Sequence, residues 1–99
     1  MSEKVTSADG KVQITRHAFR FAPIGPLSIQ GAIKNLTTIN VNARITVDFF
    51  DEAGNLMGSV SENIPDLVPD ENRLFDIWGE RVPQAYDIDS YKIASVSTY

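Results

Sequence analysis

The sequence predicts an all-β fold, an immunoglobulin-like antiparallel β-sandwich of about seven strands. Three observations predict it: turn-forming residues recur at short intervals, apolar and polar residues alternate between the turns, and several segments carry large apolar side chains on both faces. A single sheet would leave one apolar face in water, whereas two stacked sheets bury both. A length of 99 residues fits one such sandwich with one core.

The chain is expected to divide into a tail and one domain. Residues 1–10 are predicted to be a flexible polar N-terminal tail, because they offer only Val5 for burial. Residues 11–99 are predicted to form a single β-sandwich domain.

The clearest strand covers residues 42–49, where apolar and polar residues alternate without a break. Its apolar positions are Ala43, Ile45, Val47 and Phe49. An earlier strand is expected over residues 27–34, with Leu27, Ile29, Gly31 and Ile33 on one face. The side chains expected to share one dry interior are Ile33, Ile45, Val47, Phe49 and Phe75.

Other segments are patterned more weakly. Residues 11–21 change phase near Arg16 and His17, which fits either one strand with a β-bulge or two short strands. Residues 51–55 predict a hairpin turn in which Gly54 takes a positive φ and Asp51 bonds the turn backbone. Further strands are expected around three sets of apolar residues: Leu56, Gly58 and Val60; Phe75 and Ile77; Tyr91 and Ile93.

Composition excludes several classes of function. A net charge of −4, with nine scattered basic residues, argues against nucleic acid as a partner. No apolar run approaches the roughly 20 residues that cross a bilayer, so no membrane insertion is expected, and the start lacks the pattern of a signal peptide. Without cysteine the chain has no disulfide, thiolate metal site or cysteine nucleophile.

Four short motifs stand out. They are Gly31-Ala32-Ile33-Lys34-Asn35-Leu36-Thr37, Val47-Asp48-Phe49-Phe50-Asp51 followed by Gly54, Leu67-Val68-Pro69 ahead of Phe75, and Tyr91-Lys92-Ile93. Together they resemble the FxLYD domain family, small immunoglobulin-like sandwiches of bacterial and archaeal proteins, many of them exported or lipid-anchored. The chain departs from the family pattern at Asp70, where glycine is frequent, and at Phe50, which lacks the tyrosine hydroxyl. The resemblance implies a binding or accessory module, exported or associated with the cell envelope, with no shared catalytic residues.

Candidate site residues are few. His17 is the only histidine, and we expect a half-exposed strand or bulge residue there rather than a base or a ligand. Weak candidates for a divalent-cation site are the turn carboxylates Asp51, Glu52, Asp70 and Glu71, although the EF-hand spacing is absent.

Among the aromatic residues, Trp78 lies beside Gly79 at a strand end and is the candidate ligand surface. Phe49, Phe75 and Tyr91 are in phase with strand alternation and are expected in the core. The triplet Asn35-Leu36-Thr37 satisfies the glycosylation pattern but is interpreted as a turn.

These observations favour a non-catalytic interaction or spacer module of an exported or envelope-associated prokaryotic protein. The alternative is a carbohydrate- or divalent-cation-binding domain that uses loops near Asp51, Asp70 and Trp78 at one end of the sandwich. No enzymatic activity and no cofactor are expected. The expected partner is an unidentified protein, or a second copy that pairs through an edge strand.

Overall fold

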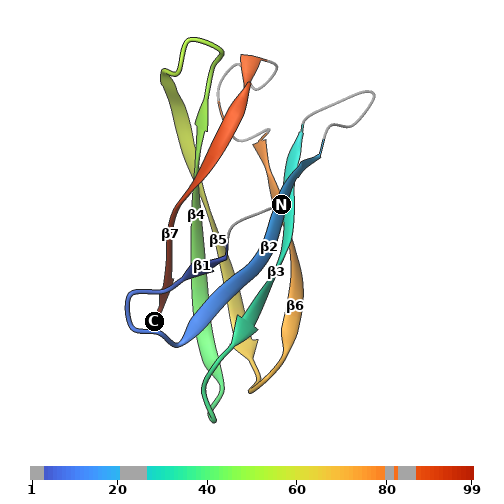
Figure 1. The fold of residues 1–99 in the computed structure, drawn as a ribbon, viewed down its shortest axis with the longest axis vertical. Coiled ribbons are helices and arrows are strands. Elements are labelled where there is room, and N and C mark those ends of the chain that lie inside the picture. Colours follow the sequence, from blue (N-terminus) through green and yellow to red (C-terminus); the bar gives the residue numbers. More distant parts are fainter. Residues whose placement is uncertain (1–3, 21–26, 80–81, 83–86) are drawn as a thin grey trace.

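The computed structural model describes residues 4–20, 27–79, 82 and 87–99 (Figure 1). Seven strands form in chain order, and no α-helix occurs in these ranges. The strands are β1 (Val5–Thr6), β2 (Val12–Arg20), β3 (Ser28–Asn35), β4 (Val41–Phe50), β5 (Leu56–Leu67), β6 (Asn72–Trp78) and β7 (Ser90–Thr98). The predicted all-β class is therefore confirmed.

The strands form two antiparallel sheets that pack as the two layers visible in Figure 1. Sheet A has the order β1-β2-β3-β6, and sheet B has the order β5-β4-β7. In an immunoglobulin constant domain the corresponding orders are 1-2-5-4 and 3-6-7. The two folds thus share an architecture of seven strands in two stacked antiparallel sheets, but their strand orders differ.

The core lies between the sheets and contains the side chains expected there. Ile33, Ile45, Val47 and Phe49 have no exposed surface, and Phe75 is 6% exposed. Each such side chain contributes roughly 1.5–3 kcal/mol by leaving water. Tyr91 differs from the expectation, because it is only partly buried and packs against the edge of this core.

Residues 12–20 form one strand with a bulge, which decides between the two alternatives left open by the sequence. Ile14 pairs with Ile33 and Arg16 pairs with Ala32, so Thr15 is an extra residue in β2. Side chains that follow an extra residue change face. Val12 and Ile14 therefore point into the core, whereas Arg16 and the alternate residues after it point outward.

The hairpin between β4 and β5 forms as predicted. Gly54 has a φ of 83°. The Asp51 carboxylate accepts hydrogen bonds of 2.9 Å from the backbone N–H groups of Ala53 and Asn55. A register shift lies next to this turn, between Phe49 and Phe50, and pairs Phe50 with Leu56. Leu56 is therefore 59% exposed, although alternation placed that residue on the buried face.

Part of the predicted N-terminal tail forms a strand, while residues 1–3 lie outside the described residues. Val5 and Thr6 pair with Ile14 and Gln13, which extends sheet A by the short strand β1. The next turn is closed by Ser7, whose buried hydroxyl accepts hydrogen bonds from the N–H groups of residues 11 and 12. A polar segment adopts this turn because its side chains bond backbone groups of the turn.

Candidate functional site

Strands β2, β3 and β6 lie side by side in sheet A, and their alternate residues project away from the core. Three cross-strand rows share this outer side. The rows are Arg16, Ala32 and Leu74; Ala18, Gln30 and Asp76; and Arg20, Ser28 and Trp78. We call the outer side of β2, β3 and β6 the outer face of sheet A.

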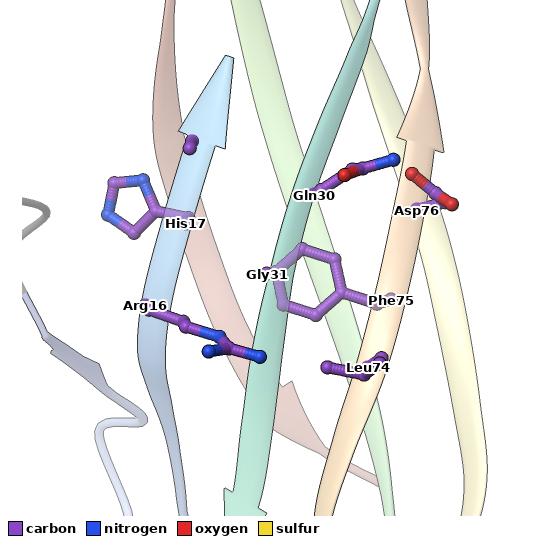
Figure 2. A pocket seen from close by; sticks show the side chains of 8 residues that line it. Arg16, His17, Gln30, Gly31, Leu74, Phe75 and Asp76 are labelled. Atoms are coloured by element: carbon purple, nitrogen blue, oxygen red, sulfur yellow. The ribbon is translucent and has the colours of Figure 1, made fainter. Parts of the chain in front are cut away.

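A groove of about 860 Å³ lies on this face. Its lining comes from all three strands: Arg16, His17 and Ala18 from β2, Gln30 and Gly31 from β3, and Leu74, Phe75 and Asp76 from β6. Figure 2 shows that Arg16 points towards β3 whereas His17 points away from it. The outward side chains of two adjacent rows thus form the walls of the groove.

Gly31 allows the strands to pack closely beneath this groove. A Cβ atom at this position would lie 2.2 Å from the carbonyl oxygen of Arg16 and 2.7 Å from the Phe75 ring. The ring of Phe75, a core residue, occupies space that any side chain at position 31 would need. The glycine is therefore required by close packing between β2, β3 and β6.

Two large apolar side chains are exposed on β6. Leu74 is 69% exposed and Trp78 is 44% exposed, and both belong to the outer face of sheet A. Ala32, between them and β2, is fully buried although it lies outside the core cluster. This face therefore carries apolar surface of its own, separate from the interior of the sandwich.

Positive charge accompanies this apolar surface. The outward positions of β2 and β3 include Arg16, Arg20 and Lys34, against the single carboxylate of Asp76 on β6. Arg20 donates a 3.1 Å hydrogen bond to the amide oxygen of Gln30. Within the described ranges none of these three cations forms an ion pair with a carboxylate.

The outer face of sheet B is chemically different, because its polar side chains bond one another. Thr46 and Ser61 hydroxyls are 2.9 Å apart. Arg44 donates a 2.9 Å hydrogen bond to Asn63 and lies 5.1 Å from the centre of the Tyr99 ring. These groups already have partners, so the two outer faces of the molecule are not equivalent.

The acidic residues proposed as cation ligands are far apart. Asp51 and Glu52 lie in the turn before β5, whereas Asp70 and Glu71 lie in the turn after it (Figure 1). The 12 residues of β5 separate these turns by about 40 Å at the rise of an extended chain. The expectation that Asp51, Asp70 and Trp78 meet at one end is therefore wrong.

Both sets of carboxylates also have structural roles. Hydrogen bonds from the backbone N–H of Asn55 and from neighbouring turn groups lower the pKa of Asp51. Glu71 accepts hydrogen bonds from Arg73, at 2.8 and 3.0 Å, and one from the N–H of Val68, and these bonds lower the pKa of Glu71. Among the described residues, no three His, Cys, Asp or Glu side chains gather where they would hold a metal ion.

His17 lies half-buried next to the bulge, between the two sheets. Its Nδ1 is 2.6 Å from the hydroxyl of Tyr91 on β7, and the two rings meet edge to face. Phe19 packs against the same tyrosine, with 5.2 Å between ring centres. Burial raises the pKa of the Tyr91 hydroxyl. The geometry indicates that this histidine joins sheet A to sheet B.

Of the residues proposed from the sequence, Trp78 lies on the outer face of sheet A, and the cation candidates lie elsewhere. Leu74 was missed, because a leucine in an alternating strand is ordinarily assigned to the core. The sequence did contain a signal, because alternation along the strand places Leu74 on the face opposite to Phe75 and Ile77.

The outer edges of the sheets are strands β1, β6, β5 and β7. No helix in the described part of the chain is long and apolar enough to span a membrane. Comparison with known proteins adds no relative: no protein-family model, curated protein or solved structure matches the chain.

Proposed function

We propose that the chain is a non-catalytic interaction module that binds its partner through the outer face of sheet A. One observation carries the proposal: Leu74 and Trp78 are exposed there beside arginines that have no carboxylate partner among the described residues. Exposed apolar surface rimmed by polar groups marks interaction sites, whereas isolated exposed apolar residues do not.

The lining of the groove supports binding rather than catalysis. General acid–base chemistry needs positioned titratable groups within reach of one reacting centre. Of the eight residues that line the groove, Asp76 alone carries a carboxylate, and the imidazole of His17 points away from β3 (Figure 2).

A carbohydrate is the second candidate ligand. The half-exposed indole of Trp78 favours it, because aromatic rings present flat apolar surface with a polar edge. A carbohydrate would occupy the same face, next to Gln30 and Asp76 in the adjacent row. Leu74 favours a protein instead, since an exposed leucine gains from contact with apolar side chains.

The cellular setting of the proposal comes from the FxLYD resemblance, which suggests export or association with the cell envelope. Fractionation of the host cell, followed by detection with an antibody against the domain, tests this part. Recovery of the domain only with cytosolic markers would contradict it.

The binding face is tested by photo-crosslinking in the host. The crosslinking residue p-benzoylphenylalanine replaces Leu74 in one variant and Ser97, on the outer side of sheet B, in a matched control. We expect a discrete crosslinked product from position 74 and none from position 97. Products from position 97 alone, or from neither position, would contradict the proposed face.

A further inference from the structure

The outer face of sheet A carries the same arrangement twice. The row of Arg16, Ala32 and Leu74 places a cation on β2, a small residue on β3 and a large apolar side chain on β6. The row of Arg20, Ser28 and Trp78 repeats this order. Both small residues are buried, at 0% exposed for Ala32 and 2% exposed for Ser28. The flanking side chains on β2 and β6 therefore project further from the sheet than the residues on β3.

The spacing of the two rows matches an extended polypeptide. The rows are four residues apart along each strand, which is about 13 Å, and β2 and β6 are about 10 Å apart across β3. A segment lying along β3 sends alternate side chains to opposite sides. Residues four apart on one side reach both arginines, and residues on the other side reach Leu74 and Trp78.

The charge of this face selects an acidic partner. Three cations stand against one carboxylate at its outward positions, in a chain whose net charge is −4. Arg16 and Lys34 make no side-chain hydrogen bond or ion pair within the described ranges, and Arg20 bonds only a neutral amide. Charge complementarity across an interface raises the rate and specificity of association.

A central polar group suits a peptide backbone. Gln30 lies between the two rows, and its amide oxygen accepts the hydrogen bond from Arg20. Its amide nitrogen has no partner among the described residues, so this group can donate to a carbonyl oxygen of a segment lying above β3.

We propose that the outer face of sheet A binds an extended, acidic segment of another protein in which acidic and apolar residues alternate. The acidic side chains pair with Arg16 and Arg20, and the apolar ones pack on Leu74 and Trp78. This inference rests on the proposed function, because it names the partner of the same face.

Trp78 provides the measurement, since it is the only tryptophan of the chain. A ten-residue peptide of alternating Asp and Val is titrated into the domain while the indole fluorescence is recorded. We expect a saturable change. A peptide of alternating Lys and Val is expected to give none, and a peptide with five Asp followed by five Val is expected to bind about tenfold more weakly.

Variants locate the site. Arg16→Ala and Arg20→Ala are each expected to weaken binding about fivefold, and raising the salt from about 0.05 to 0.5 M is expected to weaken it further. Leu74→Ser is expected to weaken binding about tenfold through lost apolar contact. Arg44→Ala, on the outer side of sheet B, is the control and leaves the affinity unchanged. Thermal unfolding of each variant shows that it is folded.

The outcomes separate this inference from the proposed function. Two results would overturn the proposal of an acidic, alternating partner segment. One is equal binding of the alternating and block peptides, and the other is an affinity that does not change when Arg16 or Arg20 is replaced. The peptide partner is also overturned if the domain binds a polyuronate but no peptide, or if light scattering shows a dimer that Arg16→Ala dissociates. Either result would still support binding through the outer face of sheet A. No response to any probe, together with no crosslink from position 74, overturns both.

Discussion

Asn35 is a fully buried polar side chain that joins three segments of the molecule. Its amide nitrogen donates hydrogen bonds to the carbonyl oxygens of Ile39, at 2.7 Å, and Leu67, at 2.8 Å. Its amide oxygen accepts hydrogen bonds from the backbone N–H and the hydroxyl of Thr37. The interpretation of Asn35-Leu36-Thr37 as a turn is therefore confirmed, and burial removes the amide from glycosylation in the folded state.

Asn35→Ala is expected to lower the free energy of unfolding by about 3 kcal/mol, because it removes the buried hydrogen bond to the carbonyl oxygen of Leu67 and the acceptor of the Thr37 N–H. Urea denaturation followed by circular dichroism measures the change. Asn40→Ala, at an exposed position nearby, is the control and is expected to change stability by less than about 0.5 kcal/mol. Equal effects of the two substitutions would contradict the role of the buried amide.

Gly31→Ala is expected to lower the free energy of unfolding by roughly 2–3 kcal/mol, because the new Cβ meets both a backbone oxygen and the Phe75 ring. The double variant Gly31→Ala with Phe75→Leu relieves only the ring contact. We expect it to remain less stable than Phe75→Leu alone in the same denaturation measurement. Equal stability of those two proteins would show that the carbonyl of Arg16 is no obstacle.

At the scale of an element, the turn between β1 and β2 is held to the C-terminal strand by one carboxylate. Asp9 accepts hydrogen bonds from the hydroxyl of Ser7, the N–H of Lys11 and the hydroxyl of Thr98 on β7. The bonds from Ser7 and Thr98, followed by that from Lys11, lower the pKa of Asp9 from 3.8 to about 2. The short strand β1 is thus tied to both sheets.

This depressed pKa predicts how stability depends on pH. A carboxyl whose pKa is lower in the folded state stabilises the fold above its unfolded pKa and loses that contribution as the pH falls through the folded value. Asp9→Asn is therefore expected to have a lower melting temperature than the parent at pH 7. The gap should narrow between about pH 4 and pH 2.

Melting curves recorded across this pH range make the comparison, with Asp87→Asn as the control. Asp87 is exposed, and its carboxylate makes no hydrogen bond within the described residues. A gap between the parent and Asp9→Asn that stays constant with pH would contradict the role of the ionised carboxylate.

Strands in which apolar and polar residues alternate without a break could be predicted from the sequence, whereas register shifts could not. The strand of Ala43 to Phe49 and the turn at Gly54 follow from local pattern and backbone preference. By contrast, the exposure of Leu56 results from a register shift, and β1 has only two residues, too few to show an alternating pattern before it pairs with β2. In the candidate site, Trp78 was proposed from its place beside Gly79 at a strand end, whereas its alignment with Arg20 required knowledge of strand pairing.

At the scale of the whole molecule, the fold is built from pairings between distant segments. Sheet A joins β3 to β6, so that Ser28 lies opposite Trp78, about 50 residues later in the chain. Each sheet also receives strands from both halves of the sequence. Closing such long loops costs entropy before contacts compensate for it, which slows folding.

We therefore expect folding on the millisecond to second timescale, in the range typical of β-sandwiches. Stopped-flow refolding from urea, followed by Trp78 fluorescence, measures the rate. Relaxation within microseconds would contradict the non-local pairing of β3 with β6.

The extra residue in β2 has a consequence for how such a surface arises. If β2 kept its length but paired without the bulge, Thr15 would lie opposite Ala32, and Arg16 and Arg20 would turn inward. His17 and Phe19 would exchange places with them and meet solvent. The bulge, rather than any substitution, thus decides which side of this strand is basic. In comparisons between homologous chains, the presence of this bulge would carry more information about partner choice than the identity of any single residue.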